Sequence, residues 1–154
     1  MKFKQLITVL AGVVLGGSAI AAGGGAHLEH ANVNVFDTAS IQRGARLYVD
    51  YCSGCHSAQY MRYKRLAKDL DYSEGEILEN LAKPGSKIGD AMTVSMDKET
   101  GAKLFGVAPP DLSLSARVRG ADWVYTYLKS FYLDESRSMG WNNTVFPNAS
   151  MPHV

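Results

Sequence analysis

A single segment, Cys52-Ser53-Gly54-Cys55-His56, constrains this chain more than any other feature of its sequence. C-x-x-C-H is the attachment signature of c-type haem. Two thiols three residues apart on a helical turn project from the same side, so both can reach the vinyl groups of one porphyrin and form thioethers. His56 follows directly, and its imidazole can bind the iron as the proximal ligand. The segment therefore predicts one haem c, attached covalently through Cys52 and Cys55.

Two other uses of the cysteine pair fit the sequence less well. A structural zinc site needs four ligands, usually with a second Cys or His pair at matching spacing. The chain has only these two cysteines, and His27 and His30 lie on an N-terminal lead at a poor spacing. A thioredoxin-like dithiol needs a strand before the motif, whereas the residues before Cys52 have helical spacing. Haem attachment remains the favoured interpretation.

The size and charge of the chain predict one small globular domain. Its 154 residues are 46% hydrophobic and 20% charged, which excludes a disordered or collagen-like chain. With 16 Lys and Arg against 15 Asp and Glu, no strong basic field is present to bind nucleic acid. We expect no nucleic-acid partner.

Residues 1–21 have the pattern of a secretory signal peptide. Two lysines are followed by an uncharged apolar run over residues 6–15 and by a small-x-small pattern at residues 19–21. The apolar run is shorter than the ~18–20 residues that span a bilayer, which disfavours a membrane anchor. We expect cleavage, export to the bacterial periplasm, and a flexible lead over residues 22–35.

Helical periodicity dominates the rest of the chain, and no run of alternating strands is evident. Asp37 or Thr38 can cap the first helix, and Asp122 the last. Ser73, with Glu76 three residues later, forms a capping box. We expect helices over residues 38–52, 60–70, 74–82 and 122–132, and long loops over 85–120 and 134–154. The predicted fold class is mainly α: a single c-type cytochrome domain with long loops that wrap the haem.

The ligand on the other side of the iron decides what the haem can do. A second protein ligand closes the iron and suits electron transfer, whereas an open position allows chemistry on a substrate. Pro152 holds Met151 extended in the last loop, which favours Met151, with Met139 next. The sulfur and imidazole candidates are Met61, Met92, Met96, Met139, Met151, His27, His30 and His153.

Several blocks of the chain resemble cytochrome c1, the c-type haem subunit of the cytochrome bc1 complex, in its bacterial form. The most specific block is Ala108-Pro109-Pro110-Asp111-Leu112-Ser113, followed by an Arg-x-Arg pair and an aromatic helix. The matching blocks are residues 44–46, 51–57, 61–63, 108–113, 117–120, 122–128 and 146–152. Residues 36–154 are therefore identified as a cytochrome c1-like haem domain.

The resemblance implies roles for further residues. The C-x-x-C-H residues keep the roles given above, and Met151 matches the distal ligand. Arg117 matches an arginine that pairs with a haem propionate, with Arg119 as the near alternative; a guanidinium suits a buried carboxylate. Pro109 and Pro110 would place apolar rings near the haem edge.

The resemblance also implies a function in the bc1 complex, ubiquinol:cytochrome c oxidoreductase. An electron would pass from the Rieske iron–sulfur protein through this haem to a c-type cytochrome, while quinol oxidation belongs to cytochrome b. The chain would be an electron carrier and no enzyme by itself. Two alternatives stay open: a free periplasmic monohaem carrier, and a haem enzyme with an open sixth site served by His153 or His27.

The C-terminus departs from the family pattern. Members continue past the Met ligand to a C-terminal transmembrane helix, whereas this sequence stops at Val154. We expect a truncated haem domain without its membrane anchor. Association with the periplasmic face of the inner membrane would then come through the complex.

Overall fold

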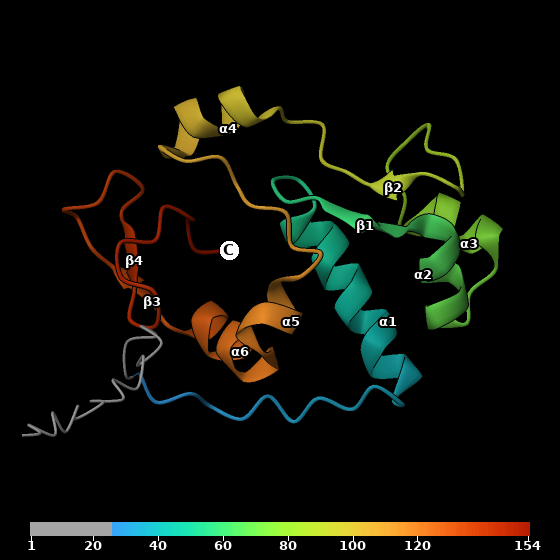
Figure 1. The fold of residues 1–154 in the computed structure, drawn as a ribbon, viewed down its shortest axis with the longest axis horizontal. Helices are drawn as coiled ribbons and strands as arrows, with labels where there is room; N and C mark the ends of the chain where they lie inside the picture. The colour runs from blue at the N-terminus through green and yellow to red at the C-terminus, as the bar shows by residue number, and fades with distance from the viewer. Residues whose placement is uncertain (1–25) are drawn as a thin grey trace, which may run out of the picture.

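The computed structural model describes residues 26–154 (Figure 1). The expected signal peptide, residues 1–21, lies outside the described residues. The described part is mainly helical, as predicted, with a few short strands. Its elements are α1 (Thr38–Leu47), η1 (Tyr48–Cys52), β1 (Ala58–Arg62), α2 (Tyr63–Leu70), α3 (Glu74–Asn80), β2 (Ala91–Met92), α4 (Lys98–Phe105), α5 (Ser115–Arg119), α6 (Ala121–Lys129), β3 (Phe131–Leu133) and β4 (Trp141–Asn143).

The helix expected to lead into the cysteine motif is present. The Asp37 carboxylate accepts a hydrogen bond from the backbone N–H of Ser40 at 2.9 Å, which caps α1. α1 continues directly into η1, a wider π-helical turn that ends at Cys52. The helix thus delivers the first cysteine at its C-terminal end.

The helix expected over residues 60–70 begins later, at Tyr63. Residues 58–62 form β1, which pairs antiparallel with β2; Ala58 lies opposite Met92. The backbone N–H of Tyr63 donates to the Asp90 carbonyl at 3.1 Å. The prediction was wrong here because the partner of this strand lies about 30 residues away, and helical periodicity gives no signal for such pairing.

The hydrophobic core lies among α1, α2, α3 and the β1–β2 pair. α3 begins with the predicted capping box: Ser73 and Glu76 exchange hydrogen bonds between side chain and backbone. Leu70 and Ile77 are 1% and 0% exposed and lie at the centre of this core. The buried core residues are Tyr63, Leu66, Ala67, Leu70, Ile77, Leu81 and Met92.

Two predicted boundaries at α6 were wrong. Gly120, at φ 87°, holds the position before the helix, and Asp122 lies in its first turn. The helix ends at Lys129 because residues 131–133 form β3, which pairs antiparallel with β4. The region expected as a loop over 85–120 also contains α4 and α5. These short elements carry too few turns to show a period in sequence.

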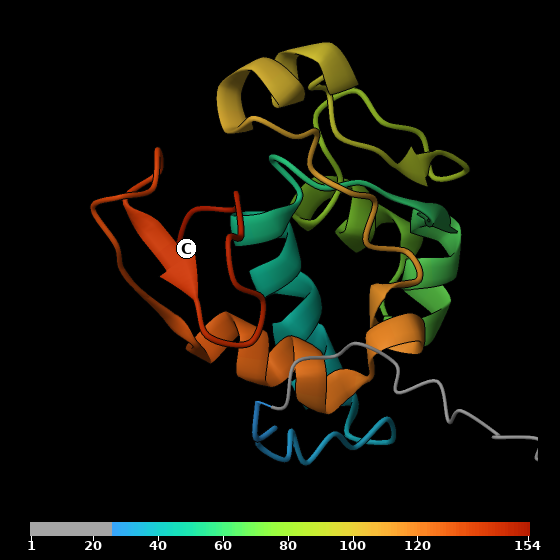
Figure 2. The same ribbon diagram turned by 60° about the vertical axis from the view of Figure 1, so that its left-hand side comes forward.

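The two sides of the molecule meet around α1. Figure 1 shows α2, α3 and the β1–β2 pair on one side of α1, and α5, α6 and the β3–β4 pair on the other. The segment from residue 26 to α1 runs beneath α5 and α6, as the turned view in Figure 2 also shows. Glu29 N–H donates to Thr126 Oγ1 at 2.8 Å, and Ala31 N–H to Asp122 Oδ1 at 2.9 Å. Within residues 26–154, no helix is both long and apolar enough to cross a membrane.

Candidate haem site

The turn after η1 brings the two cysteines and His56 together. The N–H groups of Cys55 and His56 both donate to the Cys52 carbonyl, at 3.1 and 2.9 Å. The two thiols are free and half-buried, so the pair is not a disulfide. Burial raises the pKa of the Cys52 thiol. Redox dithiols instead lower a thiol pKa to gain a reactive thiolate, so this environment disfavours that alternative.

His56 is buried, 9% exposed, and one of its ring nitrogens is already occupied. Nδ1 lies 2.7 Å from the carbonyl oxygen of Pro110. A carbonyl only accepts hydrogen bonds, so Nδ1 carries a proton, and in the neutral imidazole the lone pair then lies on Nε2. This is the arrangement in which a histidine is oriented to bind a metal through Nε2.

Tyr48 holds the backbone of His56 from the other side. Its hydroxyl donates to the His56 carbonyl at 2.8 Å. Burial, with smaller contributions from Cys52, Asp111 and Tyr63, raises the pKa of Tyr48 to about 12, so the hydroxyl stays protonated. Tyr48 was not among the predicted site residues, because nothing in a sequence shows which carbonyl a hydroxyl will meet.

The segment that supplies the Pro110 carbonyl is tied alongside β1. Leu112 N–H donates to the Ser57 carbonyl at 2.8 Å, and Gln59 N–H to Asp111 Oδ2 at 2.9 Å. Partial burial opposes ionisation of Asp111, but hydrogen bonds from Ser113 and Gln59 lower its pKa. The carboxylate thus remains charged and holds the two segments together. The contact of Pro110 with His56 is made by its carbonyl, which the sequence analysis did not anticipate.

Helix α4 packs on the same segment through a glycine. A Cβ built on Gly101 would lie 2.7 Å from Cδ of Pro109, closer than any real Cβ contact. Gly101 is buried, so the close approach is part of the packing. α4 therefore supports the residue directly before Pro110.

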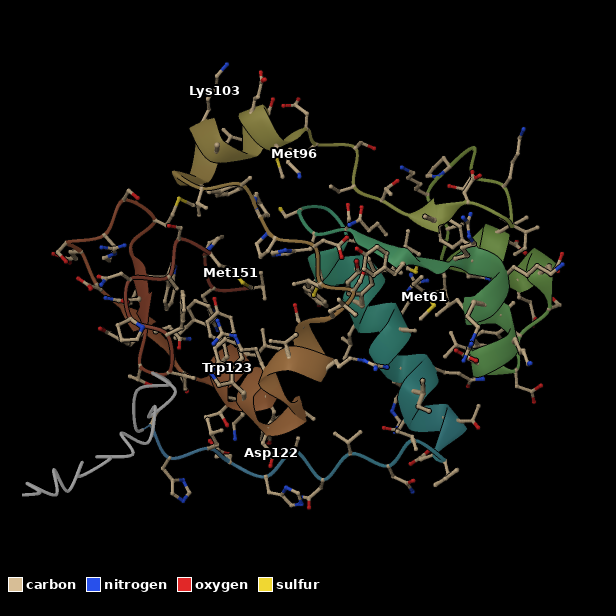
Figure 3. All side chains as sticks on the ribbon, viewed as in Figure 1. Met61, Met96, Lys103, Asp122, Trp123 and Met151 are labelled. Carbon is tan, nitrogen blue, oxygen red and sulfur yellow. The ribbon has the colours of Figure 1, made fainter. Side chains whose placement is uncertain are left out.

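Met151 lies in the C-terminal loop with its sulfur against α6. Its Sδ accepts a hydrogen bond from the Tyr127 hydroxyl at 3.6 Å. Figure 3 shows Met151 on the loop that returns from β4, with Met96 beside α4 and Met61 on the side of α2. Met92 is a core residue and Met61 packs against the core, so both side chains contribute to hydrophobic packing.

The other candidate ligands have other surroundings. His30 lies 3.1 Å from Asp122 and is exposed. The His153 ring contacts Trp141, with centroids 4.8 Å apart, and Phe131. Met151 as the distal ligand stays a prediction.

Two adjacent asparagines fasten the loop that carries Met151. Asn143, 1% exposed, donates to the Tyr127 carbonyl at 2.8 Å and accepts from the N–H groups of Val145 and Phe146. Asn142 accepts from Asn148 N–H at 2.8 Å. Neither asparagine was predicted from sequence, since an Asn pair in a loop ordinarily indicates only a turn.

The two arginines expected near a propionate have different surroundings, although both are exposed on α5. The Arg119 guanidinium lies 4.9 Å from the ring centroid of Trp123 and 5.8 Å from that of Phe146. Arg117 forms no ion pair with any carboxylate of residues 26–154. Arg119 forms no such ion pair either, so the two arginines differ in that only Arg119 lies over aromatic rings.

Comparison with known families identifies the scaffold. The model of the Cytochrome C1 family matches residues 29–153. The chain belongs to the cytochrome c1 family. Cytochromes c1 are haem c proteins of respiratory electron transport, so membership implies one covalently attached haem c.

Individual relatives agree with this assignment. The chain is 56% identical over 135 residues to cytochrome c1 of Allochromatium vinosum, covering 88% of this chain and 55% of that protein. It is 45% identical over 154 residues to an ammonia monooxygenase gamma subunit of Nitrosomonas europaea, covering 100% of this chain and 64% of that protein. It is 31% identical over 114 residues to the mitochondrial cytochrome c1 heme protein of Schizosaccharomyces pombe, covering 62% of this chain and 37% of that protein. The chain therefore spans between about a third and two thirds of the length of these relatives.

The residues present fit the haem c that a cytochrome c1 carries. Cys52 and Cys55 are unpaired thiols at the required spacing. The imidazole of His56 is buried with Nδ1 hydrogen-bonded, so Nε2 is the nitrogen left for iron. Two thiols that can form thioethers with the porphyrin and one imidazole that can bind iron are the groups that attachment of a haem c requires.

Proposed function

We propose that this chain is the haem-bearing electron-transfer subunit of a ubiquinol:cytochrome c oxidoreductase, the bc1 complex. It would receive electrons from the Rieske iron–sulfur protein and pass them to a c-type cytochrome. The observation that carries the proposal is the buried His56, held by the Pro110 carbonyl directly after the cysteine pair. A histidine fixed in this way suits an iron that must keep its ligand in both oxidation states.

His56 and Met151 are the proposed axial ligands. The bound haem would supply the one-electron chemistry, and the protein would supply rigidity. Tyr48 and Pro110 fix His56, while Asn142 and the neighbouring Asn143 fasten the loop of Met151. With both positions filled, oxygen and small substrates are kept from the iron, which favours a relay over an enzyme with an open sixth site.

The propionates and the haem edge complete the proposed site. Arg117 is the proposed propionate partner, because its guanidinium has neither an ion pair nor an aromatic contact within the described residues. Arg119 is the alternative, although it already lies over the Trp123 ring. Pro110, exposed beside this site, would place its ring near the haem edge.

The proposed partners are cytochrome b, the Rieske subunit and a c-type cytochrome acceptor. The chain would act at the periplasmic face of the bacterial inner membrane. Export would depend on the signal peptide expected over residues 1–21. Membrane association would come through the complex.

One relative favours a second candidate function. The similarity to the ammonia monooxygenase gamma subunit extends over all 154 residues. We therefore also consider that the chain passes electrons within a monooxygenase complex. The haem site would act in the same way, and only the neighbouring subunits would differ.

Purification through a tag on this chain, from membranes solubilised in mild detergent, would separate these candidates. A haem-stained band on a denaturing gel that travels with a b-type haem spectrum is the result expected for a bc1 subunit. Cys52→Ser with Cys55→Ser should abolish the stain, and Ser53→Ala, which keeps both thiols, should not. Recovery of the stained band with an oxygenase would support the second candidate. Recovery alone from the soluble fraction would contradict both and indicate a free carrier.

A further inference from the structure

We propose that Tyr127 is a positioning residue for Met151, and that its hydroxyl favours the reduced state of the iron that the methionine binds. The inference rests on the proposed function, in which Met151 is the distal ligand. It starts from one contact: the Tyr127 hydroxyl lies 3.6 Å from Sδ of Met151. A thioether sulfur has no hydrogen, so the tyrosine must be the donor.

Two aromatic side chains hold the ring of Tyr127 in place. It stacks on Trp123, with centroids 5.0 Å apart and planes 7° from parallel. Phe131 meets it edge-on, with centroids 5.1 Å apart at 68°. Two aromatic neighbours in these geometries leave the ring little freedom to turn away. The hydroxyl is therefore directed at the loop by packing and not by chance rotation of an exposed side chain.

The same buried asparagine fixes both partners of the contact. Asn143 donates to the Tyr127 carbonyl at 2.8 Å. Its Oδ1 accepts from Val145 N–H at 2.9 Å and from Phe146 N–H at 3.0 Å, at the start of the segment that leads to Met151. Ala149, two residues before Met151, is only 4% exposed. The hydroxyl and the sulfur are thus held by one connected set of contacts.

A hydrogen bond to the sulfur changes how well it donates electrons. The hydrogen bond draws electron density from the sulfur and makes it a weaker ligand. A weaker electron donor destabilises ferric iron more than ferrous iron, so the hydrogen bond favours the reduced state. Removing the hydroxyl should therefore lower the reduction potential. Because sulfur is a weak acceptor, we expect a shift of the redox equilibrium of roughly two- to fivefold, or about 20–40 mV for a one-electron couple at 59 mV per decade.

Tyr127→Phe in the haem-loaded full chain tests the proposal, since it keeps the ring and removes the hydroxyl. Tyr125→Phe is the matched control: it lies on the same helix, and its hydroxyl contacts Lys129 Nζ at 3.4 Å. Spectroelectrochemical titration should show a lower potential for Tyr127→Phe and the wild-type potential for Tyr125→Phe. The far-red charge-transfer band of a Met-ligated ferric haem should persist in Tyr127→Phe with a changed position or intensity.

Repeating the substitution in a Met151→Leu background isolates the route of the effect. If Tyr127 acts through the sulfur, Tyr127→Phe should not change the potential once the sulfur is absent. Equal shifts in the two backgrounds, or no shift in the wild-type background, would overturn the proposal. If the wild-type protein lacks the charge-transfer band, Met151 is not the ligand, and both this inference and the ligand assignment are overturned. If the band is present but Tyr127→Phe leaves the potential unchanged, only this inference is overturned.

Discussion

Nδ1 of His56 lies 2.7 Å from the carbonyl oxygen of Pro110, 54 positions further along the chain. This contact joins the C-x-x-C-H turn to the Ala108–Ser113 segment and leaves Nε2 of His56 as the nitrogen that would bind iron. The position of the carbonyl depends in turn on Pro109, which packs on Gly101 of α4. The fit of a distant helix therefore bears on the proposed axial ligand.

Gly101→Ala should disturb this support. The new Cβ would lie 2.7 Å from Cδ of Pro109, so the proline or the helix must shift. We expect the free energy of unfolding to fall by about 1–3 kcal/mol relative to Gly75→Ala, a helical glycine whose Cβ would approach nothing closer than 4.0 Å. Denaturant unfolding of the haem-loaded chain measures the difference. Equal stability of the two variants would show that α4 can shift away from Pro109 without a loss of unfolding free energy.

Asn143→Ala should loosen the loop of Met151. The side chain is 1% exposed, and its loss leaves the N–H groups of Val145 and Phe146 without their acceptor. The Tyr127 carbonyl loses one of its two donors and keeps the N–H of Ser130. We expect a loss of about 2–4 kcal/mol in unfolding free energy and weaker Met-type charge-transfer absorption. Asn80→Ala, at an exposed position of α3, should stay within about 0.5 kcal/mol of the wild type. If Asn143→Ala changes neither the unfolding free energy nor the charge-transfer absorption, contacts other than those of Asn143 hold the loop.

Arg117→Gln should change mainly the reduction potential, and Arg119→Gln mainly the free energy of unfolding. Arg119 lies over the Trp123 ring, so its loss should cost about 0.5–2 kcal/mol of stability with little effect on the reduction potential. Arg117, if it neutralises a propionate, should lower the potential when removed, because loss of a nearby positive charge favours ferric iron. Potentiometry and urea unfolding of both variants test this. The opposite pattern would assign the propionate to Arg119.

Asp122 should make stability depend on pH in acid. A hydrogen bond from Ala31 N–H, and a second from His30, lower the pKa of this carboxyl from its ordinary value of 3.8. Its contribution is therefore complete above 3.8 and is lost as the pH falls through the lowered value of the folded state. Asp122→Asn should flatten the fall of Tm in acid. Asp71→Asn, which removes an exposed carboxylate after α2, should leave that fall intact.

Local features of the fold could be predicted from sequence. The Asp37 cap, the Ser73–Glu76 capping box and the helical approach to Cys52 were confirmed, because each depends on residues within a few positions of one another. The strand over residues 58–62 was mistaken for helix, since its partner lies beyond residue 90. The end of α6 at Lys129 was missed for the same reason: β3 exists only through its pairing with β4.

The chemistry of the site follows from neighbouring residues alone. The spacing of two cysteines and a histidine specifies covalent haem, because one helical turn sets where these side chains point. By contrast, three contacts depend on how the chain packs: which ring nitrogen of His56 is hydrogen-bonded, which carbonyl accepts that bond, and which hydroxyl meets the sulfur of Met151. Those contacts join residues 54 and 24 positions apart. They exist only once packing has brought distant segments together, and no local pattern of residues records that step.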